Sequence, residues 1–467
     1  MNRKLEKILV LTVDFIAINL VWTLFYLLRV ESGLFSLFSE PEFLLPMFVV
    51  YLYWFFVFIF VGMYRTWFAL SRFDELSTLF KTSFVAIFIL FFVIFLDDYM
   101  HGEASNNRIL IFIYWGVFFI IVSFGRLFVR SFQRNLLIKG FGRRNTLIVG
   151  FNPKAFDMLD RIERYRALGL DVKGFIAVYD ENIGKEYKGI KVLDNYQNIE
   201  KAIDETDTRE VIIALDKHHE DAMIGVIAKC DPKNVGLKIV PDLYEIISGQ
   251  ARTTHIYGFP LIDIMPELMP EWEKKVKRLM DISISLIILL ISLPVTLIIS
   301  VLIKLDSPGT VLYKQKRSGL NGKEFDIYKF RSMRNDAEKS TGPVWSQKND
   351  PRITRVGKFI RKVRIDEIPQ MINVLKGEMS LVGPRPERPF FVEKLSQEIP
   401  LYKKRLKVRP GVTGWAQVKH KYDETIEDVK TKLRYDLFYI ENMSLRMDFK
   451  ILFRTVFVVL FGKGHYE

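Results

Sequence analysis

The chain has 467 residues, of which 49% are hydrophobic and 14% aromatic, with 39 phenylalanines. This length exceeds one ordinary domain, and the composition is typical of helices that face lipid rather than of an average soluble core. The single cysteine, Cys230, excludes a disulfide framework and an all-cysteine metal site, and it fits a reducing compartment.

The net charge of +13 is concentrated in the last third of the chain. Residues 304–467 hold 34 Lys and Arg against 20 Asp and Glu, a net charge of +14. Such a basic region predicts an acidic partner, which can be nucleic acid, anionic lipid headgroups or a phosphorylated substrate. Nucleic acid rests on charge alone and is not expected, because the rest of the chain points to a membrane.

Four apolar runs come first in chain order. They cover about residues 8–28, 44–63, 79–96 and 109–125, and each is long enough to cross a bilayer. The first run is too long for a cleaved signal peptide and lacks a small-residue cleavage site. We expect a four-helix transmembrane region over residues 1–135.

The charges between these runs predict the orientation of the helices. Cations gather at the N-terminus, between the second and third runs and after the fourth, at Arg3, Lys4, Lys7, Arg65, Arg72, Lys81, Arg126, Arg130, Arg134, Lys139, Arg143 and Arg144. The other two loops are acidic, with Glu31, Glu40, Glu42, Asp97, Asp98 and Glu103 against Arg29 and Arg108. By the positive-inside rule, both ends of the region face the cytoplasm.

Residues 136–255 predict a soluble α/β domain. Four short β-rich runs, "TLIVG", "KGFIAVYD", "EVIIALD" and "GLKIVPD", lie around helical patterns such as "KAFDMLDRIERYRAL". This alternation is typical of a small parallel, Rossmann-like sheet. A dinucleotide fingerprint would need glycines where Asn152 and Ala155 stand, although Asp180 could hold a ribose. A structural or regulatory module is therefore favoured over nucleotide binding.

A fifth apolar run follows a linker over residues 256–278. It carries basic residues on both flanks, so a span would leave one flank outside, against the charge rule. Pro294 removes one backbone hydrogen bond, and Ser292 is placed to bind the freed carbonyl. We expect residues 279–304 to form a broken, re-entrant membrane helix; the alternative is a kinked span. The last apolar pattern, residues 447–461, suits the membrane surface.

Two adjacent acids stand out in the basic region 305–467. Asp366 and Glu367 follow "RVGKFIRKVR" and precede Pro369 and a short apolar pattern that Gly377 ends. Asp366 can be the N-cap of a helix, where backbone N–H groups favour anions. The two acids therefore either serve only to begin a helix or take part in a reaction on a phosphate group, beside arginines and lysines that bind it.

Other chemistries lack their motifs in this sequence. His218 and His219 have no metal-ligand spacing with other ligand types. No G-x-x-x-x-G-K-[ST] phosphate loop and no G-x-S-x-G nucleophile elbow occurs. Carboxylates surrounded by cations remain as the candidate reactive group.

The segments "KRLMDISIS", "KFRSM", "RITRVGKFIRKVRIDEIPQMINVLKGEMSLVGPRPE" and "PGVTGWAQV" resemble the bacterial sugar transferases, the polyprenyl-phosphate glycosyl-1-phosphate transferases. They cover most of residues 275–467. The N-terminal part is similar to the long members of this family, which place four membrane helices and a Rossmann-like domain before a mainly α catalytic domain. The same layout occurs in membrane-bound nucleotide-sugar dehydratases.

The resemblance implies transfer of a sugar-1-phosphate from a UDP-sugar to undecaprenyl phosphate, with release of UMP, for exopolysaccharide, capsule or O-antigen synthesis. It implies that Asp366 is a nucleophile forming a phosphosugar-enzyme intermediate, and that Glu367, together with Asp366, binds Mg²⁺. It also implies the bacterial inner membrane, with the catalytic domain on the cytoplasmic face. A homodimer is expected.

Cations must offset the repulsion between a carboxylate and a diphosphate. The candidates for phosphate binding are Lys329, Arg331, Arg364 and Arg385. Two rival functions are a membrane-bound nucleotide-sugar oxidoreductase or dehydratase and a non-enzymatic membrane scaffold. The first needs a phosphate-binding glycine turn, and the second does not need acids inside a basic cluster. The sugar cannot be read from the sequence, and "KHKYDET" after "GWAQV" departs from the family.

Overall fold

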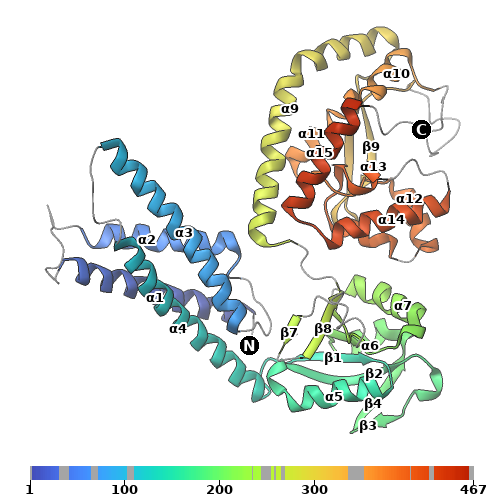
Figure 1. The fold of residues 1–467 in the computed structure, drawn as a ribbon. Coiled ribbons are helices and arrows are strands. Elements are labelled where there is room, and N and C mark those ends of the chain that lie inside the picture. Colours follow the sequence, from blue (N-terminus) through green and yellow to red (C-terminus); the bar gives the residue numbers. More distant parts are fainter. Residues whose placement is uncertain are drawn as a thin grey trace. The chain divides into compact units, whose positions relative to one another are not determined.

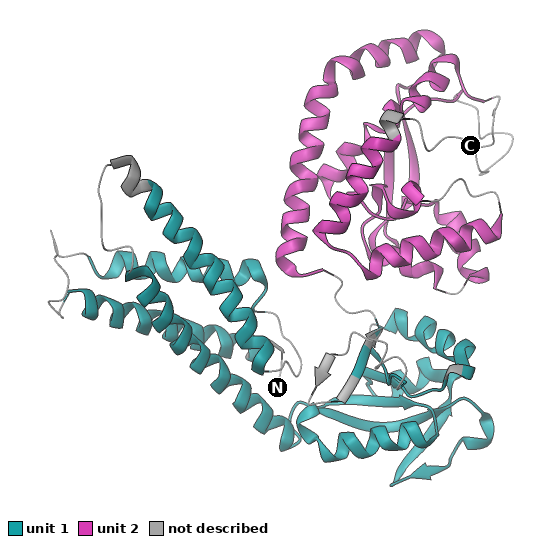
Figure 2. Ribbon diagram, in the orientation of Figure 1, with its two compact units in different colours: residues 1–266 teal, residues 267–467 magenta. Residues whose placement is uncertain are grey.

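The computed structural model describes residues 3–30, 42–64, 72–101, 110–233, 235–242, 254–256, 259–264, 269–334, 352–399, 401–419 and 425–461. The chain forms two compact units, residues 1–266 and residues 267–467 (Figure 2). Several residues used in the sequence analysis lie outside the described residues: Glu31, Glu40, Arg65, Glu103, Arg108 and most of "KHKYDET".

Unit 1 begins with four long apolar helices (Figure 1). They are α1 (Arg3–Val30), α2 (Leu44–Val61), α3 (Arg72–His101) and α4 (Leu110–Ile138). The described residues contain five helices that are long and apolar enough to cross a membrane, and these are four of them. Ile18, Trp54, Ile87 and Phe118 join all four helices in one buried core. The outward faces are also apolar, as at Phe124, which fits a lipid solvent.

A buried network of charges ties α1, α3 and α4 together. Arg126 donates two hydrogen bonds to Asp14, at 3.1 and 2.6 Å, and one to Glu75 at 2.7 Å. Arg130 donates to the other oxygen of Glu75 at 2.9 Å. Arg126, Asp14 and Glu75 are 2%, 1% and 5% exposed. Each of these charges has an opposite partner, as buried charges require.

The rest of unit 1 is the expected α/β domain. Its strands are β1 (Arg144–Val149), β2 (Leu170–Ala177), β3 (Glu186–Tyr187), β4 (Ile190–Asn195), β5 (Glu210–Ile213), β6 (Gly236–Ile239), β7 (Thr254–Ile256) and β8 (Phe259–Ile264). The sheet order is β3-β4-β2-β1-β5-β6-β8-β7. The neighbours from β4 to β6 pair in parallel, and the outer strands pair antiparallel. The four predicted strands are β1, β2, β5 and β6.

Helices cover both faces of this sheet. Helix α5 (Pro153–Arg164) packs on one face through Ala155 and Met158. Helices α6 (Ile199–Glu205) and α7 (Glu220–Cys230) pack on the other face, where Cys230 is buried. The central strands are therefore covered by apolar side chains on both sides, as parallel sheets require.

The turn after β1 is filled by a close backbone contact and by hydrogen bonds within the chain. Gly150 has a φ of +121°, and a Cβ there would meet the Ala214 carbonyl at 2.7 Å. The Asn152 side chain accepts from the Ala155 N–H at 2.9 Å and donates to the Ala214 carbonyl at 3.0 Å. Asn152 thus caps α5 and ties the start of this helix to the chain after β5. Asp180 follows β2 and accepts a hydrogen bond from Asn195.

Unit 2 consists of helices around two small sheets. Its elements are α9 (Glu271–Asp306), β9 (Leu312–Ser318), β10 (Glu324–Phe330), α10 (Arg355–Lys362), η8 (Ile365–Glu367), α11 (Gln370–Lys376), β11 (Ser380–Val382), α12 (Pro389–Glu398), η9 (Tyr402–Lys407), β12 (Gly411–Thr413), α13 (Trp415–Lys419), α14 (Ile426–Glu441) and α15 (Leu445–Phe461). Strands β9 and β10 pair antiparallel, and β11 and β12 pair in parallel.

Both ends of α9 contact other elements of unit 2. Near its start, Arg278 donates to the carbonyls of Val374 and Leu375 at the end of α11, at 2.7 and 2.9 Å. Near its end, Ile299 and Ile303 pack in a buried cluster with neighbouring elements. Figure 1 shows α9 as one long yellow helix that bends between these ends.

The middle of α9 carries a run of exposed apolar side chains. Leu290, Ile291, Leu293, Leu297 and Ile298 are between 54% and 74% exposed. A contiguous apolar surface of this kind is unusual in a protein that faces only water. Helix α15 has a smaller apolar face, where Phe453 is 75% exposed while Ile451 on the opposite side is buried.

Candidate active site

The acid pair lies in η8, a single turn between α10 and α11. Arg364, the residue before this turn, has a φ of +59°, in the left-handed region that non-glycine residues rarely adopt. The prediction that Asp366 caps a helix is wrong, because Asp366 lies inside η8 and Pro369 precedes the first residue of α11. Gly377 does end α11, with a φ of +83°, as predicted. The positive φ of Arg364 changes the direction of the backbone just before the two acids.

Asp366 is a buried carboxylate with an unsatisfied oxygen. The residue is 8% exposed, and its Oδ1 has no hydrogen-bond partner in the described part of the chain. Burial and the neighbouring Glu367 raise the pKa of Asp366, and Lys329, Arg361 and Arg364 only partly offset this rise. A buried acceptor without a donor is costly in a native fold and calls for an explanation such as a bound ion or a reactive role.

Glu367 has the opposite electrostatic environment. Its Oε1 accepts from Lys329 Nζ at 3.1 Å and from Arg385 Nη2 at 2.9 Å. Burial alone would raise the pKa of Glu367, but Arg385, Lys329 and Arg364 outweigh burial and hold it well below its usual range. The two adjacent acids therefore differ: Glu367 is a fixed anion, whereas Asp366 is the more basic carboxylate.

Two of the predicted phosphate-binding cations meet at Glu367. Lys329 comes from β10, and burial lowers its pKa although Glu367 acts against the shift. Arg385 comes from the segment that follows β11. A third, Arg364, lies close enough to lower the pKa values of both acids, and its side chain has no hydrogen bond or ion pair among the described residues. The site thus combines two acids with three of the predicted cations, and Arg361 is a fourth cation close enough to lower the pKa of Asp366.

The structure places Arg331 elsewhere. Its guanidinium is buried and donates to the carbonyls of Ile303, Ser307 and Pro308 at 3.2, 2.6 and 2.6 Å. These carbonyls are at the end of α9, where backbone acceptors lack partners within the helix. Arg331 therefore anchors the end of α9, and the predicted cations that lie at the acid pair are Lys329, Arg364 and Arg385.

Arg385 is held by a rigid backbone. The carbonyl of Pro384 accepts from Gly411 N–H at 2.9 Å, that of Arg385 accepts from Arg405 at 3.0 Å, and that of Pro386 accepts from Arg317 at 3.0 Å. All three carbonyls of the Pro-Arg-Pro segment are therefore hydrogen-bonded. The flanking prolines also restrict φ, so the guanidinium is presented from a backbone with little freedom.

Sequence reasoning missed the ion cluster that supports this segment. Arg405 is 4% exposed, pairs with Asp436 at 2.8 Å and lies 3.9 Å from Glu387. Lys432 pairs with Glu387 at 2.9 Å. Burial acts to raise the pKa of Glu387, but Lys432, Arg405 and Arg317 together lower it to about 2. Glu387 is the last residue of the quoted segment that ends in "GPRPE", and this motif is the sequence signal that could have indicated the ion cluster.

Ser292 and Pro294 lie inside an unbroken α9. The proline has no N–H for the carbonyl of Leu290, four residues earlier. The Ser292 hydroxyl instead donates to the Leu289 carbonyl at 3.4 Å, so the prediction that Ser292 satisfies the freed carbonyl is wrong. Helix α9 bends and continues, so residues 279–304 are not interrupted at the proline.

The residues present fit one Mg²⁺ ion shared with a substrate. Mg²⁺ usually takes one or two carboxylates together with substrate phosphates. Asp366 Oδ1 and the second oxygen of Glu367 accept no hydrogen bond from the described residues. The described residues contain no group of three or more His, Cys, Asp or Glu side chains with metal-site geometry. The acid pair therefore matches the one or two carboxylates that a protein contributes to such a site.

Two family models match the chain. One, described as bacterial sugar transferase, matches residues 272–462, which contain the whole candidate site. The other, described as a CoA-binding domain, matches residues 59–241.

Named relatives agree with the first match. The chain is 42% identical to the UDP-N-acetylgalactosamine-undecaprenyl-phosphate N-acetylgalactosaminephosphotransferase of Aeromonas hydrophila over 51% of this chain and 55% of that one. It is 33% identical to the UDP-glucose:undecaprenyl-phosphate glucose-1-phosphate transferase of Klebsiella pneumoniae over 70% of each chain. It is 31% identical to the enzyme of the same name from Xanthomonas campestris pv. campestris over 86% of this chain and 84% of that one.

Proposed function

The chain belongs to the bacterial sugar transferase family, and we propose that it moves a sugar-1-phosphate from a UDP-sugar to undecaprenyl phosphate. The observation that carries this proposal is the unlike pair of acids. Asp366 is buried, more basic than usual and has an unsatisfied oxygen, while Glu367 is held as an anion by Lys329 and Arg385. In such a pair, one carboxylate acts as the nucleophile and the other holds the surrounding cations in place.

The first half of the reaction uses Asp366 as the nucleophile. A carboxylate oxygen of Asp366 attacks the phosphorus that bears the sugar, and the bond from this phosphorus to the bridging oxygen breaks. UMP leaves with that bonding pair, and the sugar phosphate remains on Asp366 as a mixed anhydride. The raised pKa of Asp366 makes its ionised carboxylate a better nucleophile than an ordinary aspartate.

Cations make this attack of an anion on an anion feasible. Lys329, Arg364 and Arg385 surround the acids and offset the charge of the diphosphate as it develops in the transition state. Mg²⁺, when bound by Asp366 and Glu367, supplies further charge neutralisation for the leaving phosphate. Arg385 holds its direction because the Pro-Arg-Pro segment is fixed through its carbonyls.

The second half returns Asp366 to its starting state. A phosphate oxygen of the lipid attacks the same phosphorus, and the bond to the Asp366 carboxylate breaks. The product is a diphosphate that links the sugar to the lipid. A covalent intermediate allows a water-soluble donor and a membrane-bound acceptor to use one site in turn.

We also propose that α9 enters the membrane and returns on the cytoplasmic side. Its two ends are attached to the same unit, through Arg278 at the start and through Ile303 and Arg331 at the end. A straight span would separate these ends by a bilayer, about 30 Å thick. Cysteines placed at positions 275 and 316, in a Cys230-free protein, should be labelled from one face of sealed vesicles. Labelling from opposite faces would contradict re-entry.

A donor labelled in its β-phosphate tests the covalent step. With no lipid acceptor present, the label should stay on the wild-type protein while UMP is released. Asp366→Asn should carry no label, and Asp326→Asn, which changes an exposed aspartate in β10, should be labelled like the wild type. Label that maps to a residue other than Asp366 would refute the assignment.

The central domain supports a different expectation. Asn152 already caps α5 and bridges to Ala214, where a dinucleotide would place its phosphates. We propose that this domain does not serve an oxidoreductase reaction. An isolated fragment of about residues 140–255 should show no stoichiometric NAD binding in calorimetry, and tight binding would contradict this reading.

A further inference from the structure

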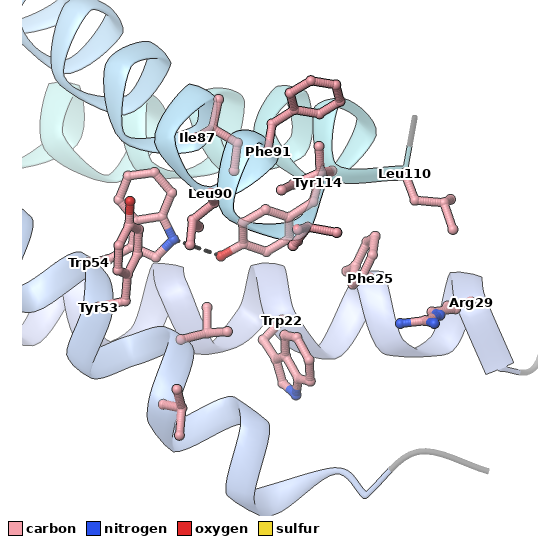
Figure 3. A pocket seen from close by; sticks show the side chains of 14 residues that line it. Trp22, Phe25, Arg29, Tyr53, Trp54, Ile87, Leu90, Phe91, Leu110 and Tyr114 are labelled. Atoms are coloured by element: carbon pink, nitrogen blue, oxygen red, sulfur yellow. Dashed lines mark hydrogen bonds between the residues drawn. The ribbon is translucent and has the colours of Figure 1, made fainter. Parts of the chain in front are cut away.

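A cavity of about 500 Å³ lies among the four helices of unit 1, and none of the residues that line it belongs to the candidate active site (Figure 3). Residues from α1, α2, α3 and α4 line it. Its volume falls within the range of about 300–1,000 Å³ that small-molecule sites occupy. Neither the sugar transferase reaction nor the packing of the helices accounts for it.

The wall of the cavity is apolar in character although it contains polar aromatic rings. Trp54 Nε1 donates to the Tyr114 hydroxyl at 2.9 Å, the dashed line in Figure 3. Tyr53 donates to the Ala86 carbonyl at 2.7 Å, and Trp22 donates to the Phe43 carbonyl at 3.2 Å. Because these donors are used within the bundle, the interior offers mainly carbon surface to an occupant. A hydrocarbon chain suits this surface.

The cavity has one cation. Arg29 lies near the end of α1, and it is the single charged residue among the fourteen that line the cavity. Figure 3 shows its guanidinium at one end of the group of lining side chains. Among the described residues, Arg29 makes no hydrogen bond and no ion pair. A partly buried guanidinium near a membrane favours an anion with oxygen acceptors, and phosphate is such an anion.

The cavity also opens on the outer surface of the helices. Val49 on α2 and Ile94 on α3 line it and are 56% and 44% exposed. Both side chains belong to helices whose outward faces are apolar, so the opening is toward lipid rather than toward water. An occupant can therefore enter sideways from the bilayer.

We propose that this cavity binds one acyl chain of an anionic phospholipid and that Arg29 holds the phosphodiester. The charges decide between this lipid and a polyprenyl phosphate. A phosphodiester carries one negative charge, which one guanidinium balances. A phosphate monoester carries close to two, and the candidate active site meets such groups with Lys329, Arg364 and Arg385 together. The proposal is independent of the sugar transfer.

Photolabelling of the full chain in nanodiscs tests the proposal. The probe is phosphatidylglycerol with a diazirine in one acyl chain, in a background of phosphatidylcholine. Label should map to residues 49–54 and 87–94, and a phosphatidylcholine probe should label these segments less. Arg29→Gln should lower the labelling roughly five-fold, which is the factor that about 1 kcal/mol per cation gives. Arg29→Lys should retain most of it.

Matched variants separate binding from folding. Lys7→Gln removes an exposed cation at the opposite end of α1 and should leave the labelling unchanged. Leu90→Trp should fill the cavity and remove the label even with Arg29 present. Equal labelling by the two lipid probes, or equal labelling of Arg29→Gln and Lys7→Gln, would overturn the proposal. Displacement of the probe by undecaprenyl phosphate but not by phosphatidylglycerol would overturn it as well.

Discussion

Two of the clusters of buried charge among the described residues differ in how completely their charges are paired. Among α1, α3 and α4, Arg126 is matched by Asp14 and Glu75, and each side-chain hydrogen bond of Arg126 goes to a carboxylate. Around η8, Asp366 keeps an unsatisfied oxygen, and Arg364 has no partner among the described residues. A fully paired cluster holds helices together, whereas an incompletely paired one has capacity left for a substrate.

The largest effect is expected at the unsatisfied acid. Asp366→Asn should lower turnover by about 10⁴-fold or more, as loss of a nucleophile does in other enzymes. The free energy of unfolding should not fall, because Asp366 is not a helix cap. An assay of UMP release together with thermal unfolding measures both quantities. Near wild-type turnover would show that Asp366 has a structural role, like the charges in the Arg126 cluster.

The same substitution has a pH-dependent effect on stability. Burial raises the folded-state pKa of Asp366, so an ionised Asp366 lowers stability at neutral pH. This cost is complete above the raised pKa and disappears as the pH falls toward the ordinary value of 3.8. Asp366→Asn should therefore be at least as stable as the wild type at pH 7 and lose that advantage in acid.

The paired cluster should respond in the opposite way. Arg126→Met leaves Asp14 and Glu75 buried without their main partner, which costs about 3–5 kcal/mol for a buried pair. Thermal unfolding of the detergent-solubilised protein should show a clearly lower midpoint. Arg72→Met, at an exposed position on α3, is the control and should change the midpoint little. Equal midpoints would show that the Arg126 network contributes little to the packing of these helices.

Arg385 tests whether a positioned cation acts in catalysis. Arg385→Gln should lower kcat/KM by about 10²-fold, the usual cost of losing one preorganised donor. Lys316→Gln, on the exposed surface of β9, should leave kcat/KM unchanged. If unfolding changes as much as activity, Arg385 belongs with the structural charges instead.

The smallest expected effect is a shift in a pH profile. Lys329 lowers the pKa of Asp366, so Lys329→Gln should raise it further. Because the proposed nucleophile is the ionised carboxylate, the acid limb of the rate profile should move to higher pH in the variant. Single-turnover rates of UMP release across the acid range measure this limb. A limb that moves to lower pH would contradict the electrostatic account.

Much of the architecture could be predicted from local patterns. Apolar length predicts the helices α1–α4, and β-branched runs predict β1, β2, β5 and β6, because these signals depend on neighbouring residues. The motif around Asp366 and Glu367 predicted where in the sequence the candidate site lies. Its local geometry could not be predicted, because the positive φ of Arg364 has no sequence signal.

The supporting contacts escaped prediction because they join distant positions. Arg405 supports Arg385 across twenty residues, and Asp436 pairs with Arg405 from a different helix. Arg331 was predicted to bind phosphate because of its motif. Its partners are instead backbone carbonyls at the end of α9, which lie far from it in the sequence. Long-range pairing of this kind is set by packing, and no local pattern records it.

The double attachment of α9 has a mechanical consequence. If α9 enters the bilayer as proposed, the depth of its exposed middle in lipid is transmitted to β10, which follows α9 and carries Lys329, because both ends of α9 contact other elements of unit 2. A thinner or thicker bilayer then raises or lowers the reaction centre relative to the headgroups. Under the proposed re-entry, bilayer thickness therefore sets the distance between the acid pair and the phosphate of a membrane-bound acceptor.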